Sequence, residues 1–183
     1  MKSFNLTRIN RLSPYRVELG DNELVFKTDY DILYSVWFEE QPVPGIKAKA
    51  YWLNLTNYSQ KSSPGDIKIR QTVTCILEEF FRTNPDVLLY MCDSANDQQA
   101  MRSRLFLRWF NAYGQQAEFY TRTEMVKDGD EENYIALIVK RDHPLLQQII
   151  EMYDTEIAMF RANKPQLNLV TLDEFMQTRL VKE

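Results

Sequence analysis

Several residue types that build common functional sites are scarce in this chain. Its 183 residues include two cysteines and one histidine. Both cysteines, Cys75 and Cys92, lie in apolar periodic segments, which predicts buried, reduced thiols rather than a disulfide framework. One histidine and two separated cysteines also argue against a structural zinc site. A Cys–His nucleophilic pair would require Cys92 and His143, which are far apart in sequence, to meet in space.

An excess of one charge and long apolar runs are missing as well. The 22 basic and 26 acidic residues leave a net charge of −4, so no global attraction to nucleic acid or to an anionic membrane is expected. No run approaches the ~18 apolar residues of a membrane span. The N-terminus lacks the apolar stretch of a secretory signal. We therefore expect a cytoplasmic protein that binds neither membrane nor nucleic acid.

What the chain does contain is enough apolar surface for one core, since 44% of its residues are hydrophobic and 13% are aromatic. We expect a single domain over residues 1–164 and a C-terminal tail over 165–183. Alternation and turn residues predict strands, and apolar stripes at helical spacing predict helices. The expected strands cover 15–19, 23–28, 32–38, 48–57, 87–91, 117–125 and 134–139, and the expected helices cover about 66–82, 95–113 and 143–160, the first of them starting at Ser63-Pro64.

This order predicts an α+β fold with a mixed, largely antiparallel sheet of about seven strands and helices on its faces. An acidic loop over 127–132 is expected to join the last two strands. Alternation places Tyr34 and Phe38 on the face opposite Trp37. We expect helices to cover one face, and the tail or a second subunit to cover the other.

The chain departs most from plain patterning where the strand at 87–91 runs into the next helix. Asp93 and Ser94 follow the strand directly, and Gln98 and Arg102 lie inside an otherwise apolar helical arc. Polar side chains in such an arc are costly unless they are satisfied. They form either a buried ion pair and hydrogen-bond set or a pocket for a small polar or anionic ligand. In both cases we expect Asp93 and Arg102 to contact each other, directly or through Gln98 or a water.

A second pair of cations lies on the same predicted helix. Arg104 and Arg108 are one helical turn apart. They form either a solvated helix face or a small patch for a phosphate or an acidic protein partner. Because no aromatic side chains interleave with them, this pair does not point to nucleic acid.

The order of elements over residues 32–140 resembles the second half of the Gcn5-related N-acetyltransferase fold. In that family a loop of the pattern Gln/Arg-x-x-Gly-x-Gly/Ala opens the first of these helices and holds the pyrophosphate of acetyl-CoA through backbone amides. The corresponding stretch here has one glycine, Gly65, while Pro64 removes a donor and Asp66 adds an anion. The tyrosine that the family tends to carry in its second helix is also missing, since Leu105 and Phe106 stand there. The resemblance therefore implies the scaffold with a degenerate coenzyme loop.

A more specific likeness lies in the residues of the strand–helix unit. The segment Cys92-Asp-Ser…Gln98…Arg102…Arg104-Leu-Phe…Trp109-Phe110 resembles the signature of an uncharacterised bacterial family. That resemblance implies one domain centred on this unit, and it implies no activity.

Together these features favour a non-catalytic binding or protein-interaction module on a degenerate acetyltransferase-like scaffold, with no cofactor. The alternative is an N-acyltransferase that uses acetyl-CoA through an atypical phosphate loop, and no metal-ligand set or catalytic triad supports a hydrolase. The tail carries apolar residues at helical spacing, Leu172, Phe175, Met176 and Leu180. We expect it to pack on its own domain or on a second subunit, which would make a homodimer.

Overall fold

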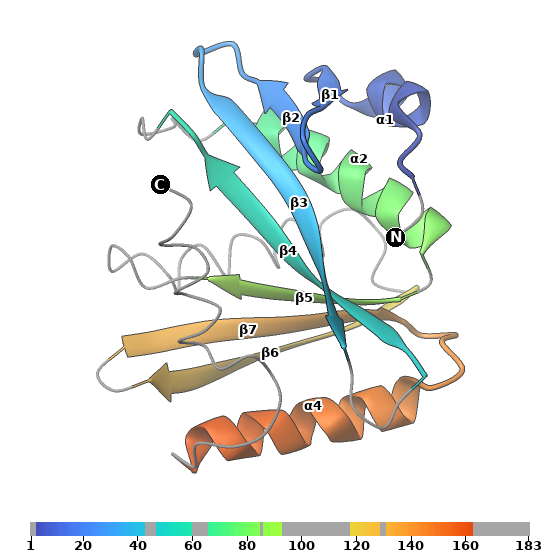
Figure 1. The fold of residues 1–183 in the computed structure, drawn as a ribbon, viewed down its shortest axis with the longest axis vertical. Helices are drawn as coiled ribbons and strands as arrows, with labels where there is room; N and C mark the ends of the chain where they lie inside the picture. Colours follow the sequence, from blue (N-terminus) through green and yellow to red (C-terminus); the bar gives the residue numbers. More distant parts are fainter. Residues whose placement is uncertain are drawn as a thin grey trace.

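Seven strands form one mixed sheet in a computed structural model that describes residues 3–42, 47–59, 66–84, 86–92, 118–128 and 131–162. The strand order is β1-β2-β3-β4-β5-β7-β6 (Figure 1). Only β4 and β5 run parallel, so the predicted α+β class and largely antiparallel sheet are confirmed. The strands are β1 (Val17–Leu19), β2 (Leu24–Lys27), β3 (Leu33–Pro42), β4 (Lys49–Asn57), β5 (Val87–Cys92), β6 (Phe119–Asp128) and β7 (Glu131–Lys140).

A short N-terminal helix, α1 (Leu6–Leu12), was not expected from the sequence. It begins after Asn5, whose side chain accepts a hydrogen bond from the backbone amide of Arg8 at 3.0 Å. Ile9 is its one buried residue. Seven residues with one buried side chain carry too little periodicity to predict a helix, and the Asn5 cap was the available signal.

Helix α2 (Ile67–Thr83) connects β4 to β5 and covers one face of the sheet. It starts later than Ser63-Pro64 because the Asp66 side chain accepts a hydrogen bond from the backbone amide of Lys68 at 2.8 Å. Its apolar stripe packs on the strand face that contains Tyr34 and Phe38, opposite Trp37 as expected. The core members of the stripe are Ile69, Val73, Ile76, Leu77 and Phe80.

Helix α4 (Leu146–Arg161) covers the opposite face over β5, β7 and β6 (Figure 1). Its buried residues Ile149, Tyr153 and Ile157 form a second hydrophobic cluster with those strands. The Tyr153 hydroxyl donates to the carbonyl of Ile135 at 2.8 Å, and Arg161 pairs with Glu124 on β6 at 2.7 Å. None of the described helices is long and apolar enough to cross a membrane.

The β6–β7 hairpin is longer than its sequence indicated. Regular pairing continues from Phe119↔Lys140 to Asp128↔Glu131. The expected acidic loop over 127–132 is therefore wrong, because most of these polar residues pair across the two strands and only 129–130 lie between them. The predicted helix at 95–113 and the tail at 165–183 lie outside the described residues.

Candidate functional site

The two parallel strands β4 and β5 separate soon after they meet. They pair from Ala50↔Val87 to Leu53↔Tyr90, and both then continue without pairing to each other. Figure 1 shows the two strands diverging toward their carboxyl ends. We call this place, between Asn54–Asn57 of β4 and Met91–Cys92 of β5, the strand fork. The carboxyl ends of neighbouring parallel strands, where they diverge, are a common position for ligand sites.

The residues that the sequence analysis singled out follow the fork directly. Asp93 comes one residue after the end of β5. All six predicted site residues lie outside the described part of the chain, so the predicted Asp93–Arg102 contact stays a prediction, as do the ligand pocket and the cation patch. The six are Asp93, Ser94, Gln98, Arg102, Arg104 and Arg108.

The start of α2, which follows β4 along the chain, has polar side chains that pair with one another or with nearby residues. Asp66 caps the helix and also accepts a hydrogen bond from the Tyr15 hydroxyl at 2.5 Å. Lys68 in the first turn pairs with Asp29 at 2.5 Å. Burial, followed by the hydrogen bond to Asp66, raises the pKa of Tyr15 to about 12. The carboxylate therefore occupies the position at which a helix start would favour an external anion.

Arg70, in the first turn of α2, differs from Lys68 because one of its side-chain nitrogens has no hydrogen-bond partner among the described residues. The Nε of Arg70 is buried and has no hydrogen-bond partner in the described structure. Arg70 lies one turn before Thr74, whose hydroxyl donates to its carbonyl at 2.9 Å. Further along α2, the centroid of the Phe81 ring is 4.7 Å from that of Phe119 on β6. Phe81 lies about three turns beyond Arg70, so Arg70 is on the same side of α2 as Phe81. Sequence reasoning missed it, although its place inside the apolar arc of α2 was visible.

A second titratable cluster lies at the other end of β5. Lys49 pairs with Glu40 at 2.7 Å, and the Tyr51 hydroxyl donates to the same carboxylate at 3.2 Å. Burial raises the pKa of Tyr51 to about 12. Burial also raises the pKa of Asp86, although the Lys49 ammonium and His143 oppose this shift. These contacts tie the β3–β4 hairpin to the start of β5.

The position of His143 excludes a Cys–His nucleophilic pair. His143 lies close enough to Asp86 to lower the pKa of its carboxyl. Asp86 comes immediately before β5, whereas Cys92 is the last residue of that strand. The Nδ1 of His143 instead accepts a hydrogen bond from the backbone amide of Leu145 at 3.1 Å, just before α4. Cys75 is buried, as predicted, and burial raises its pKa to about 11, which keeps it a thiol. Within the described ranges, no group of three metal-ligating side chains is found.

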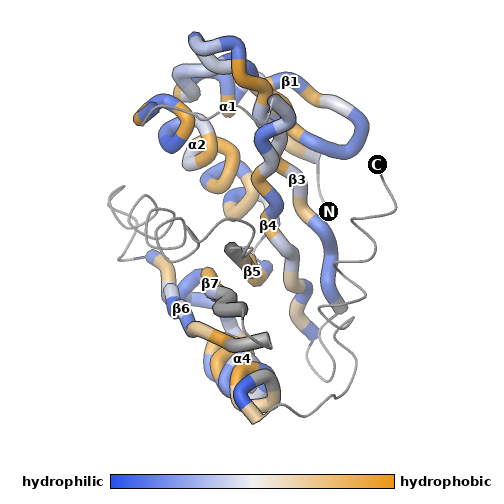
Figure 2. The backbone as a smooth tube through the Cα atoms, turned by 90° about the vertical axis from the view of Figure 1, so that its left-hand side faces the viewer, coloured by the Kyte–Doolittle hydropathy of each residue, from blue (hydrophilic) through white to orange (hydrophobic). Residues whose placement is uncertain are grey.

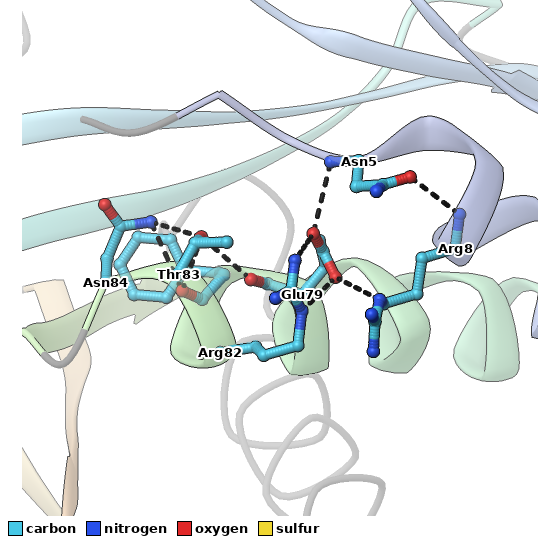
Figure 3. Close-up of polar contacts among 7 residues, drawn as sticks. Asn5, Arg8, Glu79, Arg82, Thr83 and Asn84 are labelled. Atoms are coloured by element: carbon cyan, nitrogen blue, oxygen red, sulfur yellow. Dashed lines mark hydrogen bonds and ion pairs between the residues drawn. The ribbon is translucent and has the colours of Figure 1, made fainter.

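The third polar cluster joins α1 to α2. Glu79 is 1% exposed, and its carboxylate accepts from the amide of Asn5 at 3.2 Å and from Arg82 Nε at 2.8 Å. Arg8 lies 3.7 Å from the same carboxylate. Figure 3 shows these groups converging on Glu79 between the two helices. Each member has a structural partner, so this cluster holds α1 in place rather than forming a ligand site.

Comparison with known proteins gives one match. Residues 65–155 match the model of a protein family described as a family of unknown function (DUF6169). The match runs from just before α2 into α4 and includes all six predicted site residues. It confirms the expectation of an uncharacterised family. Neither a curated protein nor a solved structure matches the chain.

Proposed function

We propose that this protein is a non-catalytic binding module that takes a small anionic ligand at the strand fork. The observation that carries the proposal is the buried Nε of Arg70, which has no partner in the described structure. We place it toward the strand fork because α2 follows the carboxyl end of β4 along the chain. A buried donor without an acceptor costs free energy, and a guanidinium is suited to a carboxylate or a phosphate. A bound anion would satisfy this donor.

The sequence supports the same position from the other strand. Asp93, Ser94 and Gln98 leave the carboxyl end of β5, and Arg102 would add a second cation. We expect Arg70 and Arg102 to approach the ligand from opposite sides of the fork, with the polar side chains setting its orientation.

The titratable groups around the start of α2 favour binding over proton transfer. Tyr15 is held by Asp66, and Lys68 is held by Asp29. A tyrosine whose pKa is raised to about 12 does not exchange its proton readily near neutral pH. These groups hold the start of α2 against the segments that flank β1 and β2 rather than supply an acid or a base.

An acetyl-CoA-dependent N-acyltransferase is the second candidate. What supports this candidate is the single parallel pair β4–β5, which is followed by an antiparallel pair β7–β6. The Asp66 carboxylate at the start of α2 argues against a coenzyme pyrophosphate at that position, because two anions would compete for the same amides.

Calorimetry on the full chain tests the proposal, with phosphate and succinate as small anions and acetyl-CoA as the competing ligand. We compare the wild type with Arg70→Gln and with the control Arg16→Gln, whose side chain is 83% exposed. We expect phosphate or succinate to bind the wild type and the control, and Arg70→Gln to weaken that binding at least tenfold.

Two results would count against the proposal. If neither anion binds, or if Arg70→Gln binds as well as the wild type, the anionic site at the fork is wrong. If acetyl-CoA binds with a low-micromolar dissociation constant, the acyltransferase becomes the better function. Circular dichroism of each variant establishes that a lost signal reflects binding rather than unfolding.

A further inference from the structure

The outer face of β2, β3 and the carboxyl half of β4 lacks a helical cover in the described chain. Figure 2 shows α2 against one side of β3 and β4, with no labelled helix on the other side at that level. Neither hydrophobic cluster includes Leu33, Trp37 or Tyr58. We call this surface the open face, formed by Val25, Leu33, Trp37, Thr56 and Tyr58.

The open face has exposed apolar side chains at one end, whereas Ser35 and Asn54 at its centre are polar and only 0% and 4% exposed. Leu33 is 37% exposed and Tyr58 is 53% exposed. The Tyr58 hydroxyl reaches Glu23 and donates to it at 2.8 Å, and the Tyr58 amide donates to the carbonyl of Leu33 at 3.0 Å. Trp37 lies next to Asn54 in the β3–β4 register. A surface with few exposed apolar side chains suits one short amphipathic segment better than the ~800 Å² per partner of a stable dimer.

We infer that the occupant is the chain's own C-terminal segment, residues 165–183, which docks on the open face with Leu172, Phe175 and Met176 turned toward the strands. This segment has an apolar side at helical spacing. A helix of that length is marginal in water, so it needs a surface to be ordered. Being tethered gives it an effective concentration near millimolar, an advantage that a second copy lacks.

The position at which α4 ends makes this docking reachable. Arg161, its last residue, contacts Glu124 on β6. Four strand spacings separate β6 from β3, about 19 Å at ~4.8 Å each. Residues 163–170 span up to about 26 Å when extended. The apolar side that begins at Leu172 can therefore arrive over β3 and β4.

Photo-crosslinking in the full chain tests this inference. We place p-benzoylphenylalanine at position 175, and at Gln177 on the opposite side of the predicted helix as a control. Irradiation of the first variant should link it to peptides of 33–42 or 49–58 at the mass of one chain. The Gln177 variant should give at least fivefold less of that product.

A pair of leucine variants adds a matched control. In the position-175 background, Leu33→Glu should lower the yield several-fold, whereas Leu19→Glu, at a 67% exposed position on β1, should leave it unchanged. Mixing isotopically light and heavy protein separates the occupants. Mixed products at twice the chain mass would assign the open face to a second copy, and links to other peptides, or none, would place the tail elsewhere. Any of these results overturns the inference.

Discussion

Replacing Glu79 by glutamine is the most informative test of how the N-terminal segment is held. The carboxylate is almost completely buried and receives hydrogen bonds from the backbone amide of Asn5 and from two nitrogens of the Arg82 guanidinium, Nε and Nη2. Glutamine keeps the side-chain volume but removes the charge. Its amide NH2 group is a donor and would face the donors of Asn5 or Arg82. Hydrogen bonds to a charged group contribute about 1.5–3 kcal/mol each. Both arginines are about half exposed and regain water, so we expect a total loss of about 2–3 kcal/mol.

That loss converts to a measurable change in thermal stability. At about 2–4 °C per kcal/mol for a chain of this size, the melting temperature should fall by about 4–12 °C. The control is Glu18→Gln, an exposed glutamate paired with Arg16 at 3.2 Å. We expect that variant to stay within about 0.5 kcal/mol of the wild type. Urea denaturation followed by circular dichroism measures both variants.

The same variant has a pH signature that separates charge from packing. The hydrogen bond from Arg82 lowers the pKa of Glu79 in the folded protein, against the opposing effect of burial. A lowered folded-state pKa stabilises the fold above the ordinary pKa of 4.5, and that contribution is lost as the pH falls through the folded-state value. The gap between wild type and Glu79→Gln should therefore shrink between pH 6 and pH 3. A loss below about 1 kcal/mol at pH 7, or a gap that does not change with pH, would refute this reasoning.

Three further predictions follow from described contacts. Tyr153→Phe removes the buried hydrogen bond to the Ile135 carbonyl at 2.8 Å, and denaturant unfolding should show a loss of about 1–2 kcal/mol; an unchanged midpoint would contradict it. Asn10→Ala removes two hydrogen bonds, at 2.7 and 2.8 Å, that cover the backbone of Val17 on the edge strand β1. It should lower stability by about 1–2 kcal/mol and increase light scattering on heating, because an edge strand is uncovered. Tyr15 has a pKa of about 12 in the folded protein, against an ordinary value of 10.0, so its protonated form stabilises the fold below pH 10. This contribution is lost as the pH rises from 10 to 12. Absorbance at 295 nm should show one fewer late-titrating tyrosine in Tyr15→Phe, and an identical curve would be evidence against that assignment.

The sequence carried the class of the fold because the apolar periods are local. The stripe of α2, the short apolar strand β5 and the alternation of β3 could each be recognised within a few residues, and their order indicated a mixed sheet. The opposite facing of Tyr34 and Trp37 was likewise determined by the two-residue repeat of a strand. Burial of Cys75 followed from its place in the α2 stripe.

Features that depend on distant partners were not recoverable in this way. Helix α1 is anchored in part by Glu79, which lies 74 residues beyond Asn5 in the chain. The polar ends of β6 and β7 looked like a loop because their pairing across the hairpin is a tertiary contact. The importance of Arg70 depends on its lack of an acceptor, a property of its surroundings rather than of its neighbours in sequence.

The candidate site likewise combines features set by local sequence with features set by contacts between distant segments. By itself, the sequence determined which residue types leave the carboxyl end of β5, since a polar set inside an apolar arc is a local pattern. Only the tertiary structure decided that β4 and β5 part after Leu53 and Tyr90, and that the Nε of Arg70 is buried without an acceptor among the described residues. Strand separation and the satisfaction of a buried donor depend on where distant segments meet, and a one-dimensional pattern does not encode that distance.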